Sequence, residues 1–330
     1  MSLSLSLATS DSELVRPLLE GRVQAKGIEL LASVCSPSEI FWRQLHYGSF
    51  DVAETAIPSL LVAREHGIAM TALPAFPARR FTQIELMAHP DAGIEKPSDL
   101  TGKRVAVVEF AQASAVWTRG ILQHDFGVAQ SSVTWYVERS DDVSYASAVG
   151  FTPPKGVRVE HMAPGETLRT MLQTHRVDAA PAAAPRALTV VERNRMASAG
   201  DPVRFVPVFP DAQGECRRFF DSHGYIPSNH CYAIRSEVAE AHPEAAVALF
   251  EALHAAKELA DQERRLPEAL VFGEEYLARS RALFGEDPYP YGFSANRPLL
   301  SDLIGFCAEQ GLIAAPVEPE ALFPEALLGT

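Results

Sequence analysis

The chain has no long apolar run. Its 330 residues are 47% apolar and 22% charged, a typical composition for a globular protein, and no segment is long enough for a membrane-spanning helix. The first residues alternate apolar and polar, which predicts a strand. They carry neither a basic leader nor an apolar block of signal-peptide length. We therefore expect a cytoplasmic protein with no membrane partner.

Cationic charge is also scarce. Lys and Arg number 29 against 42 Asp and Glu, so the formal net charge is −13. This balance argues against a broad phosphate-binding surface, and nucleic acid is not an expected partner. Any anion site must be a local pocket, which favours a small molecule as the ligand.

Metal and nucleotide fingerprints are missing as well. The four cysteines show no paired short spacing, which favours free thiols in a reducing compartment. The sequence has no His-x-His, no His-Glu-x-x-His, no Gly-x-Ser-x-Gly and no Gly-rich phosphate loop. We expect no metal and no cofactor. The only loose metal candidates are Cys216, His223, His230 and Cys231.

Helical patterns alternate with short apolar runs along most of the chain, which predicts an α/β fold with parallel sheets covered by helices. The alternation occurs twice, and a later part returns to the first unit. We predict one discontinuous lobe over residues 1–91 and 210–330, and a second lobe, residues 92–209, inserted in it. Ligands of such folds bind beyond the carboxyl ends of the strands, so the expected site is an interdomain cleft.

The pattern also predicts individual elements. A capping box at Ser10–Glu13 indicates an early helix, and residues 141–154 indicate a surface loop. The last seventy residues are helical by pattern, with a break at 285–292. The expected strands cover 28–33, 52–54, 70–76, 105–108, 133–137, 177–180, 203–209 and 230–234, and the main helices 36–45, 59–66, 115–126, 165–175 and 242–260.

The stretch from Gly102 to Gln123 is the strongest candidate for a site. A buried strand ends near Glu109, small residues including Ser114 follow, and a helix carrying Trp117 begins. A helix N-terminus after a strand presents free N–H groups and a positive dipole end to an anion. Because phosphate loops are absent, we expect a carboxylate there. A second helix start at Gly165, with Arg186 on the same rim, is predicted to face it.

Three arginines are candidate anchors for that carboxylate. Arg79 and Arg80 follow a strand and an X-Pro turn, where two guanidinium forks could hold a dicarboxylate. The alternative is a solvated surface pair. Arg119 lies one turn into the helix after Ala115, where it either faces the cleft or pairs with a carboxylate on the helix surface.

Two side chains are candidates for proton transfer. Glu109 lies at a strand end beside aromatic residues, and burial there would raise its pKa towards the range useful for proton transfer. The alternative for Glu109 is an ion pair with one of the three arginines. His230 precedes a strand that should return to the hinge, where it could donate or accept a proton near neutral pH. The alternative for His230 is a structural role.

Several segments spread along the chain are distinctive in combination: Arg16–Val23, Glu39–Arg43, Phe50–Glu54, Phe76–Phe81, Ser98–Val105, Ala115–Leu122, Gly285–Gly292 and Glu309–Leu312. In this order they resemble the 4,5-dihydroxyphthalate decarboxylase family, and the resemblance runs over essentially the whole chain. It implies a two-lobed fold like that of the type 2 periplasmic binding proteins, and cofactor-independent, non-oxidative loss of CO2 from a hydroxylated aromatic acid.

The resemblance also suggests roles. Such a reaction needs an acid over the ring carbon, an acceptor for the phenol proton and a cation for any second carboxylate. His230 is the predicted acid, Glu109 its partner or the phenol acceptor, and the three arginines the anchors. Two alternatives remain: a non-catalytic solute-binding protein or sensor of the same fold, and an enzyme of the pyrimidine-precursor or menaquinone-pathway branches. A homo-oligomer is compatible with the sequence.

Overall fold

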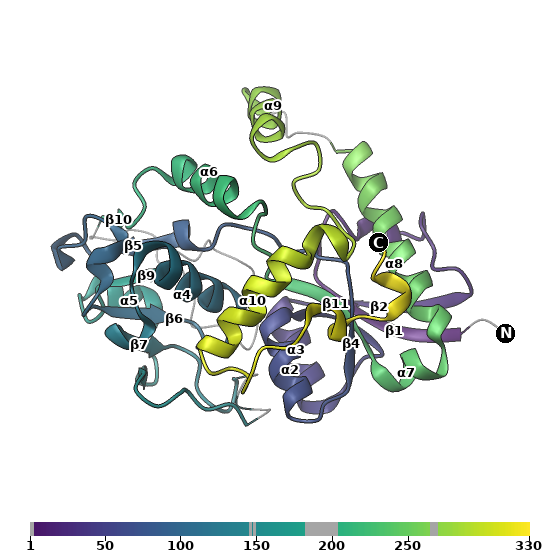
Figure 1. Cartoon of the computed structure of the whole chain (residues 1–330), viewed down its shortest axis with the longest axis horizontal. Helices are drawn as coiled ribbons and strands as arrows, with labels where there is room; N and C mark the ends of the chain where they lie inside the picture. Colours follow the sequence, from purple (N-terminus) through teal and green to yellow (C-terminus); the bar gives the residue numbers. More distant parts are fainter. Residues whose placement is uncertain (1–2, 145–146, 148–149, 182–203, 265–269) are drawn as a thin grey trace.

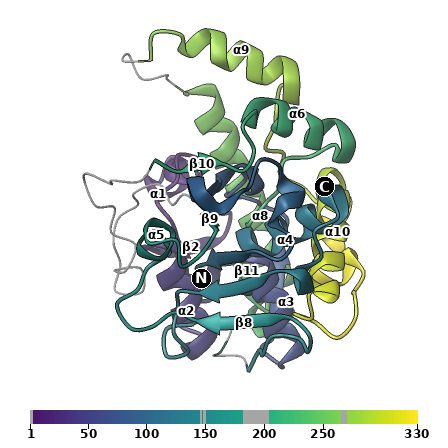
Figure 2. The ribbon, with the colours of Figure 1, turned by 90° about the vertical axis from the view of Figure 1, so that its left-hand side faces the viewer.

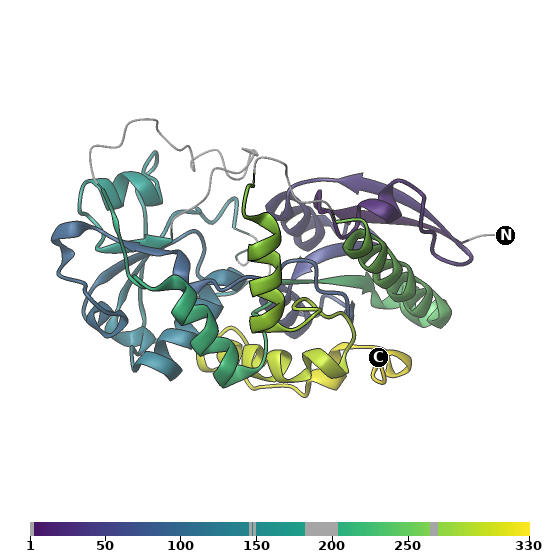
Figure 3. The ribbon, with the colours of Figure 1, turned by 90° about the horizontal axis from the view of Figure 1, so that it is seen from above.

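The computed structural model describes residues 3–144, 147, 150–181, 204–264 and 270–330. Within them the chain forms two β-sheets, each covered by helices, which lie side by side along the long axis (Figures 1 and 3). In this part of the chain, no helix combines the length and the apolar character needed to cross a membrane.

The first sheet has the strand order β2-β1-β3-β11-β4. Strands β1, β2 and β3 are parallel, and β11 runs antiparallel to both β3 and β4. All five residues of β3 are buried, as expected for a central strand with both faces covered. The bounds are β1 (Leu3–Thr9), β2 (Ile28–Val34), β3 (Val52–Ala56), β4 (Met70–Leu73) and β11 (His230–Arg235).

The second sheet has the order β10-β5-β9-β6-β7-β8. Its strands β9, β6, β7 and β8 are parallel, while β5 is antiparallel to β9 and to β10. The bounds are β5 (Leu86–Ala88), β6 (Arg104–Val107), β7 (Thr134–Val137), β8 (Arg158–His161), β9 (Ala179–Pro181) and β10 (Val206–Pro207).

The chain crosses to the second sheet between β4 and β5 and returns between β10 and β11. Because β5 pairs with β9, residues 86–88 belong to the second sheet, just ahead of the predicted lobe boundary at 91/92. The lobe boundaries at 91/92 and 209/210 remain predictions.

Helices cover both sheets. Viewed from the second lobe, α6 and α9 lie above the sheets (Figure 2). The bounds are α1 (Arg16–Leu19), α2 (Pro37–Tyr47), α3 (Ile57–Glu65), α4 (Ala113–Phe126), α5 (Leu168–Gln173), α6 (Ala212–His223), α7 (Ser236–Ala241), α8 (Pro243–Gln262), α9 (Gly273–Phe284) and α10 (Arg297–Glu309).

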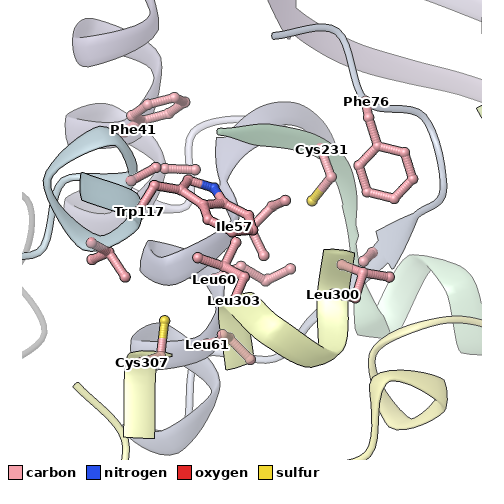
Figure 4. Close-up of a cluster of buried hydrophobic side chains, with 14 of the residues drawn as sticks. Phe41, Ile57, Leu60, Leu61, Phe76, Trp117, Cys231, Leu300, Leu303 and Cys307 are labelled. Carbon is pink, nitrogen blue, oxygen red and sulfur yellow. The ribbon is translucent and has the colours of Figure 1, made fainter. Parts of the chain in front are cut away.

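One hydrophobic core continues from the first sheet into the second. Helices α3 and α4 come from different lobes, and α10 packs against both. Trp117 of α4 is fully buried among apolar side chains of α3 and α10, including Leu60 and Leu303 (Figure 4). Its indole Nε1 donates a 2.8 Å hydrogen bond to the carbonyl of Ser228. The two lobes are therefore joined by a packed apolar seam.

Most predicted elements are confirmed, with a few corrections. Ser36 caps α2 as expected, accepting from the backbone N–H of Glu39. The Ser10 capping box is wrong, because α1 begins only at Arg16 and has no side-chain cap. The predicted elements omitted β8 and α6, and past α10 the described chain forms only short 3₁₀ turns.

Candidate functional site

The side chains of Glu54 and His230 form an acid–base pair on the first sheet. His230 opens β11 and lies opposite Ala56 of the antiparallel neighbour β3, so its imidazole reaches the carboxylate of Glu54. The Nδ1–Oε1 distance is 2.7 Å. Glu54 is 1% exposed, whereas the His230 side chain keeps 15% of its surface accessible. The pair thus has a buried acid end and an accessible imidazole end.

Ser10 completes this group from the carboxyl end of β1. Its backbone N–H and its hydroxyl both donate to Oε2 of Glu54, at 2.8 and 2.6 Å. Burial alone would raise the pKa of Glu54, but hydrogen bonds from His230 and Ser10 outweigh it and hold the pKa below its ordinary value of 4.5. Glu54 is therefore a carboxylate. A carboxylate only accepts, so Nδ1 of His230 carries a proton and Nε2 is the atom left for proton exchange.

A second charged pair lies on the second lobe. Glu109 follows β6 and Arg139 follows the neighbouring parallel strand β7, so both project from the carboxyl edge of that sheet. Nη1 of Arg139 donates to Oε2 of Glu109 at 2.6 Å, and the Ser144 hydroxyl donates to Oε1 at 2.8 Å. Both charged side chains are almost fully buried, at 2% and 3% exposed. The predicted alternative of an ion pair for Glu109 is thus realised with Arg139 rather than with any of the three expected arginines.

Helix α2 connects the two pairs. Nη2 of Arg139 donates to the Ser38 hydroxyl at 3.2 Å, a contact from the second lobe to the first. One turn later, the ring of Phe41 meets the His230 ring edge-on, with centroids 4.9 Å apart. Residues three apart lie on the same helix face. One face of α2 therefore contacts both pairs: Ser38 contacts the buried ion pair, and Phe41 contacts the acid–base pair.

Arg79 and Arg80 lie elsewhere. Arg79 donates to the carbonyls of Ile226 and Pro290, at 3.1 and 2.7 Å, and to the amide oxygen of Asn296. Its burial lowers the pKa of the guanidinium to about 10. Arg80 forms an ion pair with Glu85 at 3.3 Å and is about a third exposed. These contacts favour a structural role for Arg79 and a surface position for Arg80, so the alternative of a solvated surface pair describes Arg80 but not the buried Arg79.

Arg119, on α4, is 1% exposed. It donates to Oε1 of Gln310 at 2.8 Å and to the carbonyl of Phe110 at 2.6 Å, and its guanidinium lies 3.8 Å from the centroid of the Phe110 ring. Burial lowers the pKa of Arg119 to about 9. Arg119 therefore neither faces a cleft nor pairs with a carboxylate on the helix surface, because it links α4 to the end of α10. Trp117, the other predicted binding residue of α4, is packed in the apolar seam.

The remaining predicted residues are dispersed. Ser114, in the first turn of α4, lines a small pocket between that helix and β5, β6 and β9, and the described residues of its walls include neither Glu54 nor His230. Gly165 is exposed in the turn before α5, with a left-handed φ of 89°. Arg186 lies outside the described residues.

One cluster in the described residues has metal-ligand chemistry, and it was not predicted. His89, Asp91 and His175 place ligand atoms within 4.8 Å of one another, beside β5 and α5. The two imidazole rings are stacked, 4.1 Å apart and 9° from parallel. Ring lone pairs lie in the ring planes, so two parallel stacked rings cannot both point at one ion. Nε2 of His175 instead lies 3.1 Å from Oδ1 of Asp178.

Sequence reasoning found His230 and Glu109 but missed their partners. Glu54 had one visible signal, a carboxylate inside a short apolar strand, where an unpaired charge would be costly. Ser10 was predicted to cap a helix, which gave no indication of its contact with Glu54. Arg139 follows a predicted strand end, as Glu109 does, and that shared position is the signal that could have paired them.

Solved structures of the binding-protein fold resemble the whole chain. The periplasmic aliphatic sulphonate binding protein SsuA from Escherichia coli aligns over 100% of both chains, with a TM-score of 0.51 and 14% identity. The alkanesulfonate-binding protein SsuA from Xanthomonas axonopodis pv. citri, bound to MOPS, covers 97% of this chain and 98% of its own, with a TM-score of 0.52 and 15% identity. At such identities the likeness concerns the fold, and the predicted two-lobed α/β class is confirmed.

Relatives found by sequence share more identical residues with the chain than these structures do. The family described as NMT1/THI5 like matches residues 24–148. A 4,5-dihydroxyphthalate decarboxylase of Comamonas testosteroni is 29% identical over 99% of this chain and 98% of its own length. Another, of Pseudomonas putida, is 30% identical over 70% of this chain and 86% of its own. The chain belongs to the 4,5-dihydroxyphthalate decarboxylase family.

Proposed function

We propose that this chain is a carboxy-lyase that releases CO2 from a hydroxylated aromatic carboxylate such as 4,5-dihydroxyphthalate, without a cofactor. The names of its relatives support a decarboxylase. The observation that carries the proposal is the pair formed by Glu54 and His230, an imidazole with one nitrogen fixed by a buried carboxylate and with 15% of its side-chain surface accessible. This is the arrangement of a general acid.

The chemistry explains why such an acid suffices. Direct loss of CO2 from an aromatic ring would leave an aryl anion of high energy. If Nε2 of protonated His230 instead gives its proton to the ring carbon that bears the carboxylate, while a para phenol loses its proton to water, the ring becomes a dienone. The C–C bond to the carboxylate then breaks, and its electron pair restores the aromatic ring as a phenolate. The ring hydroxyl is the electron sink, so no cofactor is required.

The carboxylate of Glu54 supports this acid in two ways. It fixes the orientation and tautomer of the imidazole, and its negative charge stabilises the imidazolium that donates the proton. In this proposal Glu54 takes the partner role predicted for Glu109. Glu109 remains with Arg139 and transfers no proton.

A parallel measurement of turnover and binding tests the proposal. The protein is incubated with 4,5-dihydroxyphthalate, with hydroxybenzoates and with phthalate, while CO2 release and the melting temperature are followed. We expect CO2 from 4,5-dihydroxyphthalate, and stabilisation without CO2 from phthalate, because phthalate has no hydroxyl to form the dienone. Stabilisation without CO2 release across the whole series would identify a binding protein instead.

A further inference from the structure

Helix α9 makes little contact with the rest of the chain. It projects from one side of the molecule, away from both sheets (Figures 1 and 2). Of its 12 residues only Gly273 is buried. Phe284 anchors its C-terminal end, with ring centroids 5.7 Å from Phe81 and 5.1 Å from Phe220. A helix of this length is marginal in water without tertiary packing, so α9 needs a further surface to cover it.

The exposed side chains at the start of α9 are apolar. Val271 and Phe272, just before the helix, are 84% and 63% exposed, and Tyr276 in its first turn is 55% exposed. Together with Leu270 they make up four of the nine large hydrophobic side chains that are exposed in the described chain, all within seven residues. Exposed apolar side chains gathered in this way mark an interaction surface.

One side of α9 is complementary to itself. Its members follow helical spacing and are all exposed: Phe272, Glu275, Tyr276, Ala278, Arg279 and Ala282. Consider two copies of α9 lying antiparallel, with the two-fold axis level with Leu277. Phe272 then lies opposite Ala282 of the second copy. Tyr276 lies opposite Ala278, so large side chains meet small ones. Glu275 lies opposite Arg279, so each acid meets a base.

Charge selects both the partner and the direction. The first turn of α9 carries Glu274 and Glu275, and its second half carries Arg279 and Arg281. Only an antiparallel pair places the acidic half of one copy beside the basic half of the other. Within the described residues neither Glu275 nor Arg279 has an ion-pair partner. An anionic membrane surface fits less well, because the apolar residues adjoin two glutamates and the net charge is −13.

We propose that two copies of this chain associate through α9, with the two helices packed antiparallel. Association covers Phe272 and Tyr276 and gives α9 the packing that its own chain does not supply. Helices of 12 residues are only about 18 Å long, so the contact is small beside the roughly 1,200–2,000 Å² of a typical specific interface. We therefore expect a dissociation constant on the order of 1 to 100 μM.

Sedimentation equilibrium over this concentration range tests the proposal with two charge variants, Arg279→Glu and Glu275→Arg. Each variant alone places like charges at both symmetric contacts, so each should dimerise at least about tenfold more weakly than the wild type. An equimolar mixture of the two variants restores an acid opposite a base at both contacts. We expect the mixture to form heterodimers with an affinity near that of the wild type.

An aromatic substitution with a matched control tests the apolar part of the surface. Tyr276→Ser should weaken dimerisation roughly tenfold, because it removes a large side chain from the centre of the contact. Tyr47→Ser, at an equally exposed tyrosine on α2, should leave dimerisation unchanged.

A wild type that remains monomeric throughout the concentration range would overturn the proposal. So would wild-type dimerisation by either folded charge variant, with folding judged by the melting temperature. A mixture of folded variants that forms no heterodimer would reject the antiparallel register, and equal effects of Tyr276→Ser and Tyr47→Ser would reject α9 as the interface. None of these measurements involves a substrate, so their outcome is independent of the proposed decarboxylase activity.

Discussion

At the scale of single residues, the acid–base pair depends on Glu54 staying ionised inside the protein. Burial opposes its charge, and three hydrogen bonds to its two oxygens compensate. Two of the bonds come from Ser10, which follows β1, and the third comes from His230, which opens β11. This is why the sequence reveals His230 as a candidate but not its partner: strand pairing between β3 and β11 creates the contact.

The lowered pKa of Glu54 predicts how stability depends on pH. Because the folded-state pKa lies below 4.5, an unfolded chain takes up the proton first as the pH falls. The contribution of Glu54 to the free energy of unfolding is fully present above about pH 4.5 and is lost as the pH drops through the folded-state pKa. Glu54→Gln should remove this part of the acid dependence and reduce kcat on the order of a hundredfold through misorientation of His230.

Urea unfolding of the wild type and Glu54→Gln between pH 3 and 7 measures this effect. Glu20→Gln is a suitable control, because Glu20 is largely exposed and its ion pair with Arg22 is a surface pair. Parallel stability curves for the wild type and Glu54→Gln below pH 4.5 would show that Glu54 does not carry the charge described above.

At the scale of elements, the hydrophobic patterns predicted the strands and helices that define both sheets. What they missed has a physical reason. Strand β8 is a sheet edge with mostly exposed residues, so it carries no apolar signature. Helix α6 is rich in charge and buries only Glu215 and Phe219. The Ser10 capping box failed because its hydroxyl serves Glu54 instead of a helix terminus.

The packing of α4 against α10 can be tested with two glycines. A Cβ added at Gly120 of α4 would collide with the ring of Phe306, whereas a Cβ at Gly305 of α10 meets nothing within 4 Å. Gly120→Ala should therefore lower the free energy of unfolding by about 1–3 kcal/mol. Gly305→Ala should raise it by about 0.5–1 kcal/mol, because alanine is the better helix former.

Urea unfolding of both variants gives the comparison directly. The two substitutions are chemically identical, so their difference isolates the contact between the helices. Equal effects from Gly120→Ala and Gly305→Ala would mean that α4 and α10 do not approach each other as described.

At the scale of the whole molecule, two lobes share one apolar seam on the side of α3, α4 and α10, and polar groups meet at the carboxyl edges of both sheets. The sequence predicted this two-lobed arrangement, because alternating strands and helices determine where strand ends gather. It did not predict how the arginines are placed. Arg79 and Arg139 follow strands and Arg119 lies within α4, and tertiary packing buries Arg119 and Arg139 almost completely.

The central claim is that His230 delivers the proton that allows CO2 to leave. The most direct measurement is the rate of CO2 release from 4,5-dihydroxyphthalate by the wild type and by His230→Asn, with melting temperatures on the same samples. His223→Asn, at a histidine held between Asp125 and Asp302, is the matched control. We predict that His230→Asn lowers kcat about 10²- to 10⁴-fold at a similar KM and an intact fold, and that His223→Asn leaves kcat near the wild-type value. A folded His230→Asn variant with wild-type kcat would contradict the account.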